Sequence, residues 1–195
     1  MSTLTLPPPR SGPPAFEPYR ISVGRYLAMG EAGLLTPDDR VELLDGVISE
    51  KPMRGRRHVY AVKTLCRMAE AVLSGEAHAQ KEDPVVLTDS VPEPDVSVVR
   101  GTPDDYLEAL PTAGDCLLVV EVSDTTLPRD LDKAALYAEA GVPAYWIVDV
   151  NGRRVIAHRG PTPGGYADVS DGGGASIDLP GGRLTVSADD LLGDV

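Results

Sequence analysis

The sequence has little of what marks several common classes of protein. Its two cysteines, Cys66 and Cys116, lie in apolar patterns without the Cys/His spacing of a zinc site, so we expect reduced core residues. It has no Walker-type glycine loop and no Gly-x-Ser-x-Gly motif, which argues against P-loop and α/β-hydrolase enzymes. No apolar run approaches the ~20 residues that a membrane span needs. We therefore expect no membrane partner and a location in the cytoplasm.

Positive charge is also scarce. The chain has 18 Lys and Arg against 30 Asp and Glu, a formal net charge of −12, which argues against a protein that coats DNA nonspecifically. A local basic site remains open, because remote charges are screened beyond about 8 Å at physiological salt. The stretch KPMRGRRH, residues 51–58, is such a patch. It is either a solvated loop that leads into a helix or a contact for phosphate.

The 195 residues, 42% of them apolar, suit one domain with a sizeable core. Residues 1–18 are rich in proline and lack the apolar core of a signal peptide, so we expect a disordered tail. Residues 19–159 carry the regular patterns of the main domain. Residues 160–195 are rich in glycine and predict an antiparallel β extension with a C-terminal helical turn, in the same domain.

Helix and strand patterns alternate along the main domain. Asp45-Gly46 between two apolar runs predicts a β-hairpin over residues 40–51, and Asn151-Gly152 predicts another. Apolar residues at three- and four-residue steps predict helices over 56–75 and 130–141, ending at Gly75 and Gly141. Residues 84–87, 95–99, 117–122 and 144–150 have the composition of strands. This order predicts the α/β class, with a mixed sheet flanked by helices.

One acid stands in the most apolar strand. Glu121 lies within LLVVEV, and a buried carboxylate is costly unless it is paired, hydrogen-bonded or bound to a metal. Asp95 opens another predicted strand, and Glu42 lies in the apolar stretch VELL. If these strands are neighbours, the three acids converge at one edge of the sheet, where a divalent cation would relieve their repulsion. Ligands that are all oxygen suit Mg²⁺ or Mn²⁺.

Lys133 follows Glu121 by twelve residues, on the next predicted helix. A lysine there can orient an attacking water or stabilise charge on a phosphate. Together the acids and the lysine indicate metal-assisted hydrolysis of a phosphodiester.

Each of these residues also has an ordinary structural explanation. Glu42 can pair with Arg40 or Arg25, Asp95 can cap a turn, and Lys133 can be a solvated lysine on a helix. Glu121 is the hardest to explain in this way, because its strand is expected to be buried on both faces.

Several motifs in order resemble a known family. They are VELLDG, the helix-opening His58, PEPDVSVV, LLVVEVSDTT, DLDKAALY and AGVPAYWIVD. In that order they resemble a large bacterial family usually labelled restriction endonuclease, formerly a domain of unknown function, and similar to the PD-(D/E)XK nuclease superfamily. The resemblance covers Tyr19 to Arg159. It implies a restriction-endonuclease-like core, with a mixed four-stranded sheet flanked by helices and extra hairpins.

The resemblance also implies roles for single residues. Asp95 falls on the aspartate of the PD motif and Glu121 on the acid of (D/E)XK. The lysine of that motif falls on Ser123, a departure that the family accommodates with a lysine from the following helix, here Lys133. Glu42 corresponds to a glutamate of the early hairpin. The basic run before His58 departs from the family's usual loop, so we expect His58 to act at most through another residue.

Two classes of function follow. The first is a Mg²⁺-dependent endodeoxyribonuclease. In it Asp95 and Glu121 bind the metal, Glu42 completes this metal-binding cluster directly or through water, and Lys133 positions the nucleophile or the phosphate. The second is a binding or assembly module that keeps the fold without turnover. Hydrolysis of RNA shares the same metal chemistry, so the sequence leaves that substrate open. Enzymes that cut both strands often act as two-fold dimers, so we expect a homodimer.

Overall fold

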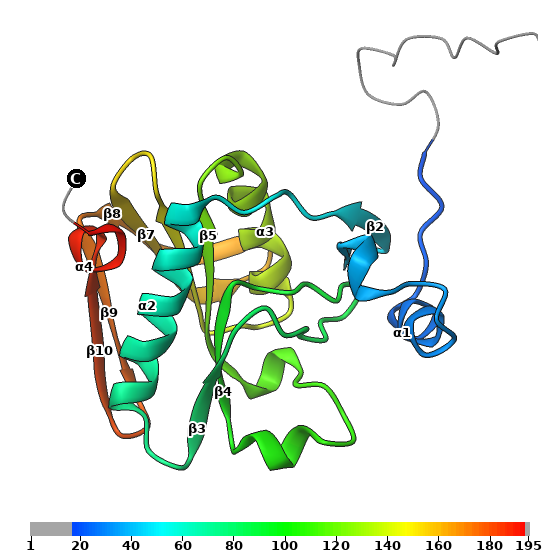
Figure 1. Cartoon of the computed structure of the whole chain (residues 1–195), viewed down its shortest axis with the longest axis horizontal. Helices are drawn as coiled ribbons and strands as arrows, with labels where there is room; N and C mark the ends of the chain where they lie inside the picture. Colours follow the sequence, from blue (N-terminus) through cyan, green and yellow to red (C-terminus); the bar gives the residue numbers. More distant parts are fainter. Residues whose placement is uncertain (1–16, 194–195) are drawn as a thin grey trace, which may run out of the picture.

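The computed structural model describes residues 17–193, and most of the proline-rich tail expected over residues 1–18 lies outside this range. Four α-helices and ten strands form the described part (Figure 1). The helices are α1 (Val23–Glu31), α2 (Arg56–Val72), α3 (Leu127–Glu139) and α4 (Ala188–Leu192), with short 3-10 helices η1 (Pro37–Asp39), η2 (Pro103–Tyr106) and η3 (Ala113–Asp115). The strands are β1 (Val41–Leu44), β2 (Val47–Glu50), β3 (Ala77–Gln80), β4 (Val96–Arg100), β5 (Cys116–Ser123), β6 (Ala144–Asp149), β7 (Arg154–Thr162), β8 (Gly165–Gly172), β9 (Gly174–Leu179) and β10 (Gly182–Ser187).

A mixed sheet of six strands forms the centre, in the order β3-β4-β5-β6-β7-β8. Its strands pair antiparallel except β5 and β6, which are parallel and are connected by α3. The α/β class with a mixed sheet between helices is thus confirmed. The sheet is wider than the four strands that the resemblance implies, because β3 and β8 extend its two edges.

The central sheet is buried on both faces. Figure 1 shows α2 across one face, with α4, β9 and β10 beside it. Leu65 of α2 packs there with Leu118, Val120 and Trp146. On the opposite face Tyr137 of α3 packs with residues such as Val119 and Tyr145. Since side chains alternate along a strand, Glu121 follows Val119 on the face that α3 covers.

The hairpin of β1 and β2 forms a separate two-stranded sheet. Its turn confirms the prediction from Asp45-Gly46, because both residues have positive φ, 48° and 71°, as a type I′ turn requires. The hairpin is joined to the rest of the chain by backbone hydrogen bonds between Leu43 and Val91. Glu42 therefore reaches the site from outside the central sheet, and not from a neighbouring strand as expected.

Other details differ from the sequence patterns. Strand β3 lacks a strong apolar alternation and was not predicted, while residues 84–87 form only an isolated bridge from Val86 to Thr112. Val59 and Leu131 are exposed, although both belong to the apolar repeats that predict the helices. Helix α2 ends at Val72, before the predicted terminator Gly75. Periodicity identified the helices and most of their buried positions, such as Val62, Leu65 and Ala69 of α2 and Ala134 and Tyr137 of α3.

The two cysteines are free thiols, as predicted. Burial raises the pKa of Cys116 to about 12 and that of Cys66 to about 11, so both thiols stay protonated near neutral pH. None of the helices in residues 17–193 is both long and apolar enough to cross a membrane.

The glycine-rich C-terminal part is integrated with the central sheet. Strand β8 pairs with β7 over most of its length. The β9–β10 hairpin and α4 contribute Leu184, Val186 and Leu191 to the same core as α2. These residues cover a face of the sheet that α2 alone leaves open.

We expect Leu191→Ala to lower the free energy of unfolding by about 2–5 kcal/mol, because Leu191 is fully buried in the main core. The matched control is Leu107→Ala at an exposed leucine, with an effect below about 0.5 kcal/mol. Urea unfolding followed by circular dichroism measures both. Equal stabilities of the two variants would mean that the C-terminal segment does not support the core.

Candidate active site

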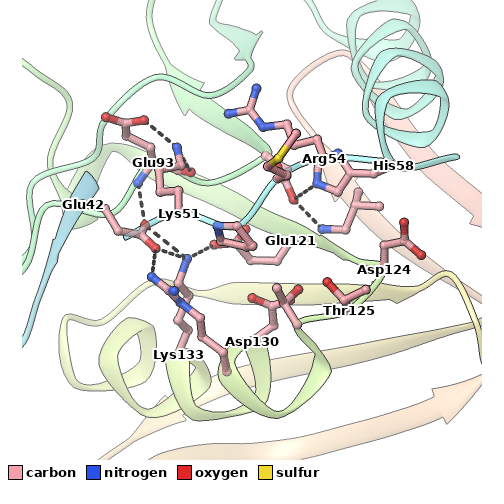
Figure 2. Close-up of a pocket in the computed structure, with 16 residues that line it drawn as sticks. Glu42, Lys51, Arg54, His58, Glu93, Glu121, Asp124, Thr125, Asp130 and Lys133 are labelled. Atoms are coloured by element: carbon pink, nitrogen blue, oxygen red, sulfur yellow. Dashed lines mark hydrogen bonds and ion pairs between the residues drawn. The ribbon is translucent and has the colours of Figure 1, made fainter. Parts of the chain in front are cut away.

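A small pocket lies where the start of α2, the end of β5 and the first turns of α3 meet (Figure 2). Its space of about 50 Å³ is enough for an ion with a few waters and too small for a nucleotide. Six acidic side chains face four basic ones across it, a formal excess of two negative charges. The lining residues are Glu42, Lys51, Pro52, Met53, Arg54, His58, Glu93, Asp95, Glu121, Val122, Asp124, Thr125, Thr126, Arg129, Asp130 and Lys133.

Asp95 stands just before β4, at the point where the ladder with β5 ends. Val96 pairs with Val120, so Asp95 lies across from Glu121 on the adjacent antiparallel strand. Its Oδ2 accepts the backbone N–H of Val122 at 2.7 Å and lies 3.0 Å from His58 Nε2. Asp95 therefore accepts a backbone N–H of β5 beyond the end of the ladder with β4, and does not only cap a turn.

Glu121 meets the predicted lysine in the buried part of the pocket. Lys133 Nζ lies 2.9 Å from Glu121 Oε1, and the hydroxyl of Tyr137 donates to the same oxygen at 3.3 Å. Lys133 and Tyr137 are one turn apart on α3, so they present their polar ends to the same strand. Lys133 is buried and is not the solvated helix lysine of the alternative explanation.

Glu42 is held by cations and a backbone amide. Its carboxylate lies 3.0 Å from Lys133 Nζ and 2.8 Å from Arg129 Nη2. The backbone N–H of Glu93 also donates to it at 3.2 Å. Both carboxylate oxygens of Glu42 thus have partners, and neither Arg40 nor Arg25 is one of them. A part for Glu42 in metal binding, directly or through water, stays a prediction.

The charged groups of this cluster shift one another's pKa values. Burial raises the pKa of the Glu121 carboxyl to about 8, although the Lys133 ammonium opposes the shift. Burial alone would lower the pKa of Lys133, but the carboxylates of Glu121 and Glu42 outweigh it and the pKa rises. Since Lys133 has two carboxylate partners, it stays protonated whether or not Glu121 carries a proton.

The sequence patterns predicted no direct part in the site for two residues of the pocket. His58 was expected to act only through another residue, and it contacts Asp95 from the first turn of α2. Asp130 stands in the predicted helix, where the sequence pattern gives it no role. It is buried beside the site, accepts from the Thr126 hydroxyl at 2.5 Å, and has a pKa raised by burial. An Asp three residues before Lys133 lies on the same helix face, and that spacing was the available signal.

The basic stretch 51–58 forms one wall of the pocket. Lys51 pairs with Glu93 and Arg54 pairs with Glu82, each at 2.5 Å. The first pair holds the loop against the turn that precedes Asp95, and the second holds it against the segment after β3. The loop thus has partners within the protein and also faces the pocket, so both explanations of the basic run remain open.

The donor set fits a hard divalent cation held by few protein ligands. In the part of the chain that the structure describes, no three His, Cys, Asp or Glu side chains are spaced to hold a metal ion. Within the described residues, the hydrogen bonds to Asp95 all use Oδ2 and those to Glu121 all use Oε1. The other oxygen of each carboxylate is therefore left for a ligand. Mg²⁺ commonly binds through one or two carboxylates and keeps several waters.

Comparison with known proteins agrees with the fold and the motifs. Residues 24–187 match the model of the Uma2 family, described as "Putative restriction endonuclease". The chain belongs to this family. Its fold is similar to a crystal structure titled as a "putative nuclease belonging to DUF820" from Anabaena variabilis, with a TM-score of 0.68 and 18% identity, covering 88% of this chain and 97% of that one. No curated protein matches the chain.

Ser123 stands where the resemblance places the lysine of the (D/E)XK motif. That residue is buried, and its hydroxyl lies 3.3 Å from the Thr126 hydroxyl at the start of α3. Lys133 reaches Glu121 from the helix instead of from the strand. The relocated lysine therefore still meets the acid of the strand, although it comes from a different element.

We expect the stability of the metal-free protein to fall between pH 5 and 8 because of Glu121. Its pKa is about 8 in the fold and ordinarily 4.5, so its contribution is fully present below pH 4.5 and is lost as the pH rises toward 8. Relative to wild type, the free energy of unfolding of Glu121→Gln should rise by up to about 1.4 kcal/mol per pH unit in that window. Urea unfolding at four pH values measures the difference.

The control is Glu108→Gln at an exposed position, whose stability should follow the wild-type pH profile. If E121Q also followed it in parallel, the upward shift of the Glu121 pKa would be wrong.

Proposed function

We propose that this Uma2 protein is a metal-dependent endonuclease that hydrolyses phosphodiester bonds of DNA, with Mg²⁺ or Mn²⁺ as its cofactor. The observation that carries the proposal is the 2.9 Å contact between Lys133 Nζ and Glu121 Oε1, beside Asp95 in one pocket. A fold kept only as a binding module would have no need to bury a lysine with two carboxylates, since each buried charge costs free energy.

Asp95 and Glu121 would hold the metal with the oxygens that face away from His58 and Lys133. A bound divalent cation would lower the pKa of a coordinated water and neutralise charge on the phosphate. Glu42 contributes by holding Lys133 and Arg129 in place, because its own oxygens are engaged with them. This assignment keeps the four predicted residues but gives Glu42 an indirect part.

Lys133 would act on the nucleophile or the phosphate. Its ammonium lies 2.9 Å from Glu121 Oε1 and within 3.2 Å of both oxygens of Glu42. Because Lys133 also lines the pocket, the ammonium would lie close to a water or a phosphate oxygen bound there. Because Glu42 and Glu121 fix the ammonium, the donor is oriented before the substrate arrives, which is the condition for electrostatic catalysis.

The substrate must approach along the wall formed by Lys51, Arg54 and Arg129. The pocket admits an ion and waters, so the scissile phosphate would lie at its mouth with the rest of the strand outside. Partly exposed guanidinium groups there suit phosphate oxygens, which they contact in bidentate fashion. DNA is the proposed substrate, and RNA is the alternative that the same metal chemistry would serve.

Wild-type protein with Mg²⁺ or Mn²⁺ should cut supercoiled plasmid, and EDTA should abolish the activity. We expect Asp95→Asn, Glu121→Gln and Lys133→Met each to lower the cleavage rate by at least about 100-fold, because each removes a charged group at the reacting phosphate or its metal. Agarose-gel assays of nicked and linear product measure the rates, with a single-stranded RNA arm in parallel.

Asp132→Asn and Lys63→Met are the controls, since both residues are exposed on the same helices as site residues and should retain wild-type rates. A preparation that binds Mn²⁺ but cuts neither DNA nor RNA would favour the binding module. Cleavage of RNA but not of DNA would show that the substrate is RNA, the alternative named above.

We propose that the protein acts as a homodimer, the state that cleavage of both strands favours and the commonest symmetric oligomer. Size-exclusion chromatography with light scattering at micromolar concentration should give twice the mass of the 20.6 kDa chain. A monomer at every concentration tested would contradict this prediction.

A further inference from the structure

His58 is a buried pocket residue to which the proposed reaction gives no role. It lies in the first turn of α2 and is only 7% exposed. Its Nε2 lies 3.0 Å from Asp95 Oδ2, the same oxygen that accepts the Val122 N–H. Two donors therefore converge on one oxygen of Asp95, from a strand on one side and from a helix on the other.

The surroundings of Nδ1, the other ring nitrogen, indicate which nitrogen of His58 carries the proton. Nδ1 is buried and has no hydrogen-bond partner in the described residues. Of the two neutral tautomers, the one with its proton on Nε2 is favoured, because a proton on Nδ1 would be an unsatisfied buried donor, which costs free energy. In this form His58 donates to Asp95 through Nε2, and this bond is the only polar contact that the structure gives its side chain.

The start of α2 is held close to the end of β5. A Cβ built at Gly55, the residue before α2, would lie 2.5 Å from Asp124 Oδ2. Gly55 thus lets the carboxylate of Asp124, which follows β5, lie against the start of α2. The first turn of α2, which carries His58, is therefore close to the strand end where Val122 meets Asp95.

We propose that His58 is a positioning residue that orients Asp95 for metal binding, an inference that rests on the proposed function. The bonds from His58 and Val122 fix Oδ2, so the carboxylate cannot rotate and Oδ1 remains toward the pocket. Partners that orient a ligating side chain in this way typically change metal affinity by about 10–100-fold when removed.

The test is the affinity for Mn²⁺, measured by isothermal titration calorimetry on the full chain. His58→Leu keeps the bulk but removes the donor, and it should weaken Mn²⁺ binding by at least about 10-fold. His58→Gln can place an amide N–H near the position of Nε2 and should stay within about 3-fold of wild type. His58→Asn reaches only to the position of Nδ1 and should behave like His58→Leu.

His78→Leu is the matched control. His78 bonds the carbonyl oxygen of Gly101 at the edge of the sheet and does not line the pocket, so its loss should leave Mn²⁺ affinity unchanged. If His58→Leu does not fold, the comparison of the Gln and Asn variants decides, because both keep a polar side chain. Thermal melts confirm that the compared variants are folded.

The outcomes separate this inference from the proposed function. Wild type that binds Mn²⁺ together with a His58→Leu variant that binds it equally well would overturn the positioning role and leave the nuclease proposal intact. Equal weakening by the Gln and Asn variants would also overturn it, because only a general packing role would then remain. A wild-type chain without Mn²⁺ affinity would overturn the proposed function itself.

Discussion

The buried ammonium of Lys133 is the interaction on which the site depends. It lies between the carboxylates of Glu121 and Glu42, which belong to different sheets. The Lys133 ammonium favours the charged form of both carboxyl groups, although burial still raises the pKa of Glu121. With Lys133 present, and with Arg129 on Glu42, the early hairpin and the central sheet are joined at one point. The same group that stabilises this junction is oriented toward the pocket.

The central sheet makes this arrangement rigid. Helix α2 packs on one face and α3 on the other, so each helix delivers polar side chains to the strand end from its own side. His58 comes from α2 and Lys133 from α3, and both reach the acids at the junction of β4 and β5 (Figure 2). Residues on well-packed helices and strands hold their positions more accurately than residues on loops, which suits a site that must orient a phosphate.

The sequence predicted the elements better than the faces they bury. Turn residues at 45–46 and 151–152 identified two hairpins, and apolar periodicity identified α2 and α3. The buried face of α3 was found only in part: Ala134 and Tyr137 are buried, but Leu131 is exposed while Asp130 and Lys133 are buried. A pattern of apolar residues cannot reveal a helix face that is buried through ion pairs, since charged residues ordinarily indicate the solvent side.

The sequence by itself determined the fold class, the family, and the importance of Glu121, whose place in an apolar strand has few ordinary explanations. Only the tertiary structure decided the partners. It brought Glu42 to Lys133 and Arg129 across 91 and 87 residues of chain, and it brought His58 to Asp95. Such contacts depend on how the hairpin and helices pack around the sheet. Local sequence patterns do not contain that information, because spacing along the chain fixes neighbours only within one element.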